Sequence, residues 1–248
     1  MITATFREGS FRDKAVLVSG GTSGIGAAIG SALAELGANV TITGATEAEA
    51  ADAKRRAAFP IERAAALDVR DGAAVGTFVA ALPKLDILIN CAGIIHRGTE
   101  HDPAVFAEVL DVNLTGTMRL CAAARPLLAK TQGCIVNTAS MLAFIGGALV
   151  PGYSASKGGV AQLTKSLAIA YAPERIRVNA IAPGWIITKL TQPLKDDPAR
   201  SEAIVGRTPL GRWGAPDDVA GTAVFLCSPA ASFVTGAIIT IDGGYLAA

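Results

Sequence analysis

The stretch Lys14-Ala-Val-Leu-Val-Ser-Gly-Gly-Thr-Ser-Gly-Ile-Gly26 decides the fold class of this chain. Lys14–Ser19 is a short apolar run of the kind that forms a buried strand, and Gly24–Leu36 has the composition of a helix. The glycines between them allow a tight turn and a close approach of another backbone. The start of the helix then presents unpaired N–H groups and a partial positive charge to a pyrophosphate. The pattern predicts a strand–turn–helix unit that binds a dinucleotide.

Downstream, short β-branched runs alternate with longer alanine-rich stretches. The further expected strands are Asn39–Thr43, Ile61–Leu67, Leu85–Asn90, Cys134–Thr138, Arg177–Ala182 and Ala237–Ile241. The further expected helices are Glu47–Ala57, Asp71–Leu82, Pro103–Ala129, Pro151–Tyr171 and Asp217–Leu226. Apolar strands in this order are typical of a parallel sheet covered by helices on both faces. We therefore expect an α/β fold, a single doubly wound Rossmann-type domain over residues 1–248 with about seven parallel strands.

The composition excludes several classes of function. Hydrophobic residues make up 51% of the chain, and 22 Lys and Arg nearly balance 21 Asp and Glu. No basic stripe or membrane-length apolar run occurs, so neither nucleic acid nor a membrane is an expected partner. The four cysteines and two histidines lack metal-type spacing, so we expect no metal and reduced thiols. With no signal-peptide core near its first residues, the chain is expected to be cytoplasmic.

Tyr153 and Lys157 lie four residues apart in Tyr-Ser-Ala-Ser-Lys, and Ser140 lies upstream. Residues at i and i+4 share one face of a helix. A lysine there would favour the phenolate, whose parent phenol has an ordinary pKa of about 10. Together with a cofactor charge, it could bring this pKa toward about 7, which takes roughly 4 kcal/mol. By itself the pair also fits an ordinary turn of a surface helix.

The ordered set of these residues resembles the short-chain dehydrogenase/reductase family, from about Lys14 to Gly244. The matching segments are Gly20-x-x-x-Gly24-x-Gly26, Asp68-Val69, Asn90-Cys-Ala-Gly93, Asn113, Ser140, Tyr153-x-x-x-Lys157 and Pro183-Gly184 with Thr188. Two departures are mild: Ser19 replaces the usual threonine, and Cys91 replaces the usual second asparagine. The resemblance implies a cofactor of the NAD(P)(H) type, a small alcohol or ketone substrate and a homotetramer.

The resemblance also implies a role for each matching residue. Tyr153 would exchange a proton with the substrate oxygen, which Ser140 would hold. Lys157 would tune Tyr153 and bind the nicotinamide ribose, and Asn113 would hold a relay water. Cofactor binding is expected of Gly20, Thr22, Ser23, Gly24, Ile25, Gly26, Ala45, Asp68, Val69, Asn90, Ala92, Gly93, Tyr153, Lys157, Pro183, Gly184, Ile186 and Thr188.

The choice between NAD and NADP depends on the end of the second strand. A carboxylate there binds the adenosine 2′-hydroxyl group and repels a 2′-phosphate. The sequence Thr43-Gly-Ala-Thr46 has none before Glu47, but Ala45 and Ser23 are also not basic. Thr46, Lys54 or Arg55 could approach a phosphate. The balance slightly favours NADP.

The substrate is expected to lie among His96, Met141, Trp185 and Leu190, with residues 186–207 as a substrate loop and 1–12 as an N-terminal extension. His96 and Arg97 could meet an anionic or hydroxylated group. Residues 90–97, 139–144 and 211–214 are similar to stretches of bacterial gluconate and deoxygluconate dehydrogenases, which implies a sugar acid or polyol. A 3-oxoacyl-thioester reductase of fatty-acid type and a xenobiotic ketone reductase remain alternatives.

Two other classes of function fit the same fold. A nucleotide-sensing relative without chemistry should have a broken set of catalytic residues, and this set is whole. An epimerase or dehydratase with a Tyr-x-x-x-Lys motif usually carries a further substrate domain, for which this chain leaves no room. An active oxidoreductase is therefore the favoured interpretation.

Overall fold

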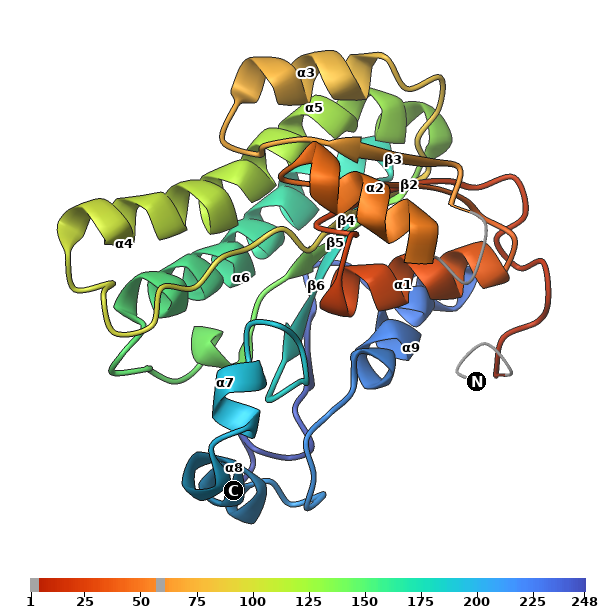
Figure 1. Ribbon diagram of the computed structural model, residues 1–248. Helices are drawn as coiled ribbons and strands as arrows, with labels where there is room; N and C mark the ends of the chain where they lie inside the picture. The colour runs from red at the N-terminus through yellow and green to blue at the C-terminus, as the bar shows by residue number, and fades with distance from the viewer. Residues whose placement is uncertain (1–4, 57–60) are drawn as a thin grey trace.

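The computed structural model describes residues 5–56 and 61–248 and contains one seven-stranded sheet (Figure 1). The strands follow the spatial order β3-β2-β1-β4-β5-β6-β7, and every neighbouring pair is parallel. Their bounds are β1 Ala15–Ser19, β2 Asn39–Gly44, β3 Arg63–Ala66, β4 Ile87–Asn90, β5 Cys134–Thr138, β6 Arg177–Pro183 and β7 Ile238–Ile241. The predicted doubly wound α/β class is confirmed.

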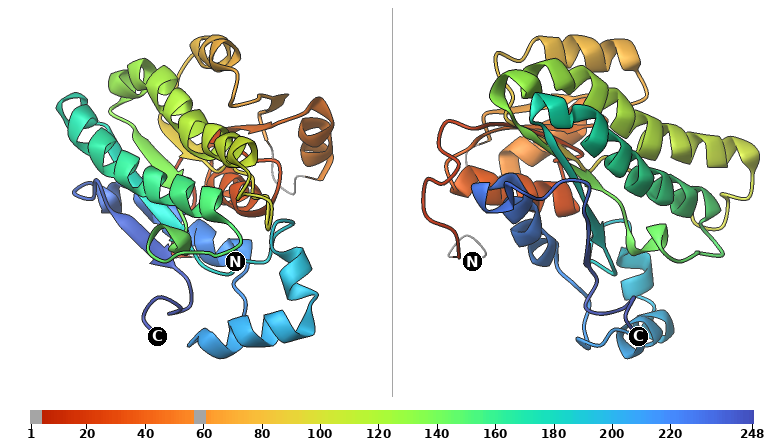
Figure 2. Two further views of the ribbon diagram at one scale, coloured as in Figure 1. Left: turned by 90° about the vertical axis from the view of Figure 1, so that its left-hand side faces the viewer. Right: turned by 180° about the vertical axis from the view of Figure 1, so that it is seen from behind.

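Helices cover both faces of the sheet (Figures 1 and 2). On one face α1 packs against α9, and on the other α3 packs against α5 and α4 against α6. The helices are α1 Gly24–Glu35, α2 Glu47–Arg56, α3 Gly72–Ala80, α4 Pro103–Leu110, α5 Gly116–Thr131, α6 Pro151–Tyr171, α7 Gln192–Lys195, α8 Pro198–Arg207 and α9 Pro216–Cys227.

Strand β1 shows why the inner strands of the sheet are mostly apolar. Successive side chains of a strand point to opposite faces. Val16 and Val18 join the core under α1 and α9, while Leu17 joins the core under α3, α5 and α6. Both faces are buried, so every position of the strand favours an apolar residue.

The chain changes direction across the sheet between β1 and β4. Strand β1 pairs with β2 on one side and β4 on the other, so their following loops diverge. Such a switch point opens a crevice at the carboxyl ends of the strands. A Cβ atom on Gly20 would lie 2.5 Å from the Ala92 nitrogen, so glycine is required where these loops meet.

Two segments differ from the sequence-based expectation. Residues 186–207 were expected to form a substrate loop, but they contain the helices α7 and α8. These two helices belong to a small lobe, residues 187–213, which has its own apolar cluster. The expected helix Pro103–Ala129 is interrupted by a π-helical turn at Asp111–Thr115. Of the expected segments, Ala57 and residues 1–4 lie outside the described residues.

Within residues 5–56 and 61–248, no helix has both the length and the apolar character needed to cross a membrane. All four cysteines are free thiols, and three of them are buried.

Candidate active site

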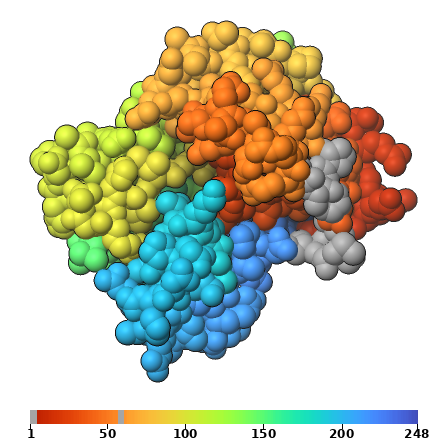
Figure 3. Space-filling view, in the orientation of Figure 1, coloured from red at the N-terminus to blue at the C-terminus, as the bar shows by residue number. Residues whose placement is uncertain are grey.

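A cavity of about 730 Å³ lies at the carboxyl ends of the strands. The space-filling view shows a hollow where the orange, yellow-green and cyan segments meet (Figure 3). Among the expected cofactor residues, the lining includes Gly20, Thr22, Ser23, Gly24, Ile25, Gly26, Ala45, Asp68, Val69, Ala92, Gly93, Tyr153, Lys157, Pro183, Gly184, Ile186 and Thr188.

The glycine-rich turn fits a pyrophosphate. Gly20 and Gly24 have φ angles of 69° and 54°, which favour glycine because other residues are strained there. Ser23 is the N-cap of α1, and in the described structure its side chain caps no N–H group. The first-turn N–H groups of α1 therefore face the cavity as donors for an anion.

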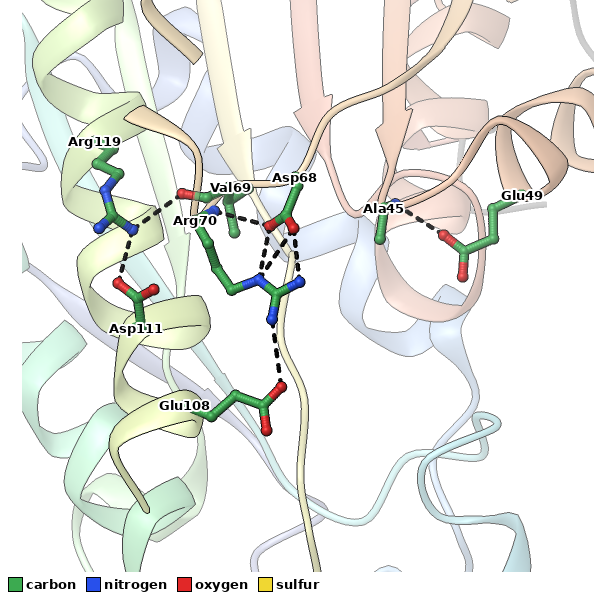
Figure 4. A network of polar contacts seen from close by, with 8 residues as sticks. All are labelled: Ala45, Glu49, Asp68, Val69, Arg70, Glu108, Asp111 and Arg119. Atoms are coloured by element: carbon green, nitrogen blue, oxygen red, sulfur yellow. Dashed lines mark hydrogen bonds and ion pairs between the residues drawn. The ribbon is translucent and has the colours of Figure 1, made fainter. Parts of the chain in front are cut away.

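A carboxylate approaches the end of β2 from helix α2. The Glu49 Oε2 atom accepts a hydrogen bond from the Ala45 N–H group at 2.8 Å (Figure 4). Glu49, Gly44 and Ala45 all line the cavity. Sequence reasoning looked for a carboxylate only as far as Glu47 and beyond it considered only the basic residues Lys54 and Arg55, so it missed Glu49. The signal was present, because Thr46 and Glu49 have the spacing of a capping pair, and Thr46 Oγ1 accepts from Glu49 N–H.

Arg70 joins two elements at the same end of the cavity. Its guanidinium donates to the Asp68 carboxylate at 2.7 and 3.0 Å and to Glu108 of α4 at 3.4 Å (Figure 4). The hydrogen bond from Arg70 lowers the pKa of Asp68. The Arg119 side chain binds the Val69 carbonyl oxygen and the Asp111 carboxylate, which secures the expected Asp68-Val69 segment from the other side.

Ser140, Tyr153 and Lys157 meet in the cavity. Ser140 follows β5, while Tyr153 and Lys157 lie in the first two turns of α6. The Ser140 hydroxyl group accepts a hydrogen bond from the Leu142 N–H group at 3.2 Å and lies near enough to the Tyr153 phenol to lower its pKa. Lys157 is only 4% exposed, and its Nζ donates to the Thr138 carbonyl oxygen at 2.7 Å. Three of the four residues expected to be catalytic therefore line the same cavity.

The pKa values differ from the expectation of a phenol near 7. Burial raises the pKa of Tyr153 to about 12, and the negative charge of Glu100 acts in the same direction. The nearby Ser140 hydroxyl group and the positive charge of Arg97 lower the pKa of Tyr153, but by less than burial raises it. Burial lowers the pKa of Lys157 to about 8. The Lys157 Nζ lies over the Tyr153 ring, 5.4 Å from the centroid. For both side chains, loss of hydration on burial is the largest effect on the pKa.

Asn113 lies in the π-helical turn and is completely buried. Its Nδ2 donates to the Ile94 carbonyl oxygen and the Ser156 hydroxyl group, both at 3.0 Å. Its Oδ1 accepts from the Ile94 N–H group at 2.8 Å. Asn113 therefore ties the loop after β4 to α6. Because both side-chain donor hydrogens are used by protein groups, a relay water would need another donor or acceptor.

Besides Asn113, two expected site residues lie outside the cavity lining. Asn90 is buried, and its Nδ2 donates to Asn137 Oδ1 at 2.9 Å and to Cys121, so its side chain stabilises the core between β4 and β5. The His96 ring faces α4, with Nε2 3.5 Å from a Glu108 carboxylate oxygen. The neighbouring Arg97 lines the cavity in its place.

The end of the cavity near residues 186–207 contains the other residues expected to contact the substrate, together with two further side chains. Met141, Trp185 and Leu190 line the cavity as expected. Arg207 and Tyr245 line it too, with the guanidinium 4.4 Å from the ring centroid. Arg207 is the last residue of the expected substrate segment 186–207, whereas Tyr245 was not among the expected site residues.

Positive charge gathers at this end of the cavity. Arg97, Lys189 and Arg207 line it. Burial and the charge of Arg200 lower the pKa of Arg97, as expected where guanidinium groups are close and partly desolvated. An anionic group would be stabilised here.

A family model described as "Enoyl-(Acyl carrier protein) reductase" matches residues 20–246. The chain belongs to the short-chain dehydrogenase/reductase family. It is an NAD(P)-dependent oxidoreductase that acts on CH–OH groups. The family assignment made from the glycine-rich turn and the Tyr-x-x-x-Lys motif is confirmed.

Three relatives in this family are informative about substrates. The chain is 43% identical to 2-dehydro-3-deoxy-D-gluconate 5-dehydrogenase of Pseudoalteromonas atlantica, over 96% of this chain and 97% of the relative. It is 38% identical to galactitol 2-dehydrogenase (L-tagatose-forming) of Cereibacter sphaeroides, over 92% and 93%. It matches the structure of a gluconate 5-dehydrogenase from Burkholderia cenocepacia in complex with NADP and tartrate, with a TM-score of 0.90 and 33% identity, over 96% and 97%.

Proposed function

We propose that this enzyme oxidises a secondary hydroxyl group of a sugar acid, with Tyr153 as the acid/base. The observation that carries the proposal is a single cavity in which Ser140, Tyr153 and Lys157 meet beside the cationic side chain of Arg97. The relatives support it, because one is named for a dehydro-deoxygluconate and another was crystallised with tartrate. A polyol is the second candidate, favoured by the relative named galactitol 2-dehydrogenase.

Each residue has a distinct task in this proposal. Ser140 donates a hydrogen bond that places the substrate oxygen next to the Tyr153 hydroxyl group. Tyr153 receives the hydroxyl proton in oxidation and returns it in reduction. Lys157, held by the Thr138 carbonyl oxygen, keeps a cationic donor beneath the phenol. Bound NAD(P) supplies the hydride acceptor in oxidation and the donor in reduction.

The geometry of the chain fits such a dinucleotide. The glycines at positive φ and the N–H groups of α1 suit the pyrophosphate, and Asp68-Val69 would border the adenine end. NADP in related structures supports the use of the phosphorylated form. Glu49 acts against it, because a carboxylate beside the ribose repels a 2′-phosphate.

Nicotinamide absorbance with a small matrix of substrates tests the proposal. The matrix crosses NAD and NADP with gluconate, 2-dehydro-3-deoxygluconate and galactitol, and NADH and NADPH with a 3-oxoacyl thioester. The proposal is supported if one of the sugar acids gives the highest kcat/KM among these substrates. Turnover of the thioester alone would replace it with a lipid-type reductase.

Arg97 provides a sharper test of the sugar acid. A hydrogen bond to a charged group contributes about 1.5–3 kcal/mol, so Arg97→Gln should raise KM for gluconate by roughly 10- to 100-fold. The neutral amide of gluconate is the matched substrate, and its KM should change by less than about threefold. An equal rise for acid and amide contradicts recognition of the carboxylate by Arg97.

We also infer a homotetramer in the cytoplasm. The small and apolar residues on α5 and α6, including Ala122–Ala124 and Ala168–Ala170, support helix packing across a two-fold axis. Light scattering at micromolar concentration tests the tetramer, and the mass of a monomer would exclude it.

A further inference from the structure

Glu100 is a buried carboxylate that the proposed reaction does not use. It lies in the loop between β4 and α4 and is only 1% exposed. Its Oε1 accepts a hydrogen bond from the His96 N–H group at 2.8 Å, and its Oε2 accepts one from the Tyr153 N–H group at 2.7 Å. A buried carboxylate is costly unless it is hydrogen-bonded, so this position calls for a physical reason.

The first reason lies at the start of helix α6. The N-cap residue is Val150, whose side chain has no polar atom, and Tyr153 is the third residue of the helix. An N–H group at this position lacks an intrahelical partner. Glu100 supplies the acceptor from another element and places a negative charge at the positive end of the helix. A Cβ atom on Gly152 would lie 3.3 Å from Glu100 Oε2, so glycine leaves room for this approach.

The second reason lies in the loop itself. Through His96, Glu100 fixes the residue next to Arg97. The Gly98 N–H group donates to the Leu149 carbonyl oxygen at 2.8 Å, which joins the same loop to the segment before α6. At the other end of the loop, Asn113 holds both backbone groups of Ile94. The loop that carries Arg97 is therefore fastened to the helix that carries Tyr153.

We propose that Glu100 is a positioning residue, whose carboxylate holds the Tyr153 helix and the Arg97 loop in one geometry around the substrate. The proposal rests on Tyr153 being the acid/base, as stated above, and holds for whichever alcohol the enzyme oxidises. Glu100 is not among the residues that line the cavity, and its carboxylate acts through hydrogen bonds from the backbone N–H groups of His96 and Tyr153.

The charge of Glu100 also reaches the phenol. The groups that face Tyr153 are Lys157 on its own helix, Ser140 after β5, and Arg97 and Glu100 from the loop after β4. Among them Glu100 carries the negative charge, which disfavours the phenolate. Removing this charge should move the pH dependence of oxidation to lower pH.

Three variants separate these effects. Glu100→Gln removes the charge and turns one acceptor into a donor that faces an N–H group. Gly152→Ala keeps the charge but places a methyl group against Glu100 and Phe106, while alanine otherwise favours a helix. Asp102→Asn is the matched control, because Asp102 accepts from backbone N–H groups of the exposed start of α4 in the same loop.

The measurements are kcat and KM against pH with the best substrate of the wild type, Kd for the dinucleotide, and hydrogen exchange of the Tyr153 amide. For Glu100→Gln we expect kcat to fall at least tenfold, the pH profile to move to lower pH, Kd to change less than twofold and the amide to exchange at least tenfold faster. Gly152→Ala should lower kcat without moving the profile, and Asp102→Asn should change neither.

Either of two results would overturn the proposal. One is a Glu100→Gln enzyme with kcat within twofold of wild type and an unmoved pH profile. The other is an unchanged exchange rate of the Tyr153 amide, a readout that needs no substrate. Inactivity of the wild type toward sugar acids would instead overturn the proposed substrate and leave the exchange measurement valid.

Discussion

Replacing Lys157 with methionine tests how much the buried ammonium group destabilises the folded protein. Lys157 is 4% exposed, and burial lowers its pKa from 10.5 to about 8. Methionine keeps a flexible stem of similar shape and removes the charge. It also removes the hydrogen bond to the Thr138 carbonyl oxygen, which costs about 1–3 kcal/mol at every pH.

The magnitude follows from the pKa of Lys157 in the two states. Holding the proton against a pKa of about 8 rather than 10.5 costs the folded enzyme about 3 kcal/mol near pH 7. Between pH 8 and 10.5 the unfolded chain binds more protons than the folded one, so the free energy of unfolding rises with pH. From pH 7 to pH 10 we expect the wild type to gain about 2.5 kcal/mol relative to Lys157→Met.

Urea unfolding, followed by the fluorescence of Trp185 and Trp213 at fixed protein concentration, measures this difference at each pH. Lys165→Met is the matched control, because Lys165 lies on the same helix but is exposed. Its free energy of unfolding should run parallel to that of the wild type. If the Lys157→Met curve is also parallel from pH 7 to 10, the reasoning about a desolvated ammonium group is refuted.

Three further predictions concern the site. Tyr153→Phe should bind the dinucleotide with unchanged Kd but lose about 10²- to 10⁴-fold in kcat, and retained turnover would exclude Tyr153 as the acid/base. Glu49→Gln should raise kcat/KM with NADP relative to NAD about tenfold, the effect of about 1.4 kcal/mol of repulsion, and an unchanged ratio would place the ribose elsewhere. Gly20→Ala should destabilise the fold by at least about 1–2 kcal/mol in urea unfolding, because a Cβ atom would meet Ala92 at a positive φ; a stable variant would contradict the close approach.

The sheet was predictable because its inner strands β1, β4, β5 and β6 are buried on both faces, which leaves nearly continuous apolar runs such as Val16–Val18. The ends of some segments differ from the expected ends by one or two residues, as at the start of β4, because capping and strand pairing determine where an element ends. Helix α8 begins at Asp197-Pro198, with Asp197 accepting from Arg200 N–H, a signal that the expectation of a loop concealed.

Parts of the site depend on contacts that no local pattern encodes. The π-helical turn arises where Asn113 bonds to both Ile94 and Ser156, from different elements. Glu49 reaches the end of β2 from a helix, whereas the rule for cofactor choice considers the strand end. Asn90 matches the family motif, but it points into the core because alternate residues of β4 face opposite ways. Glu100 meets Tyr153 only once α4 and α6 are packed together.

The lobe at residues 187–213 follows strand β6 and ends before helix α9, and its two ends lie side by side. The Ile187 N–H group donates to the Gly214 carbonyl oxygen at 2.8 Å, and the Gly214 N–H group donates to the Trp185 carbonyl oxygen at 2.9 Å. Between these ends, Leu194, Ile204 and Trp213 form a small core of their own.

A segment closed at its base in this way can be exchanged as one piece. Chimeras that replace residues 187–213 with those of a relative keep the strands, the glycine-rich turn and the residues from Asn113 to Lys157 in place. Evolution can use the same route, because substitutions in this module change the part of the cavity lined by Lys189, Leu190 and Arg207 and leave Ser140, Tyr153 and Lys157 in place.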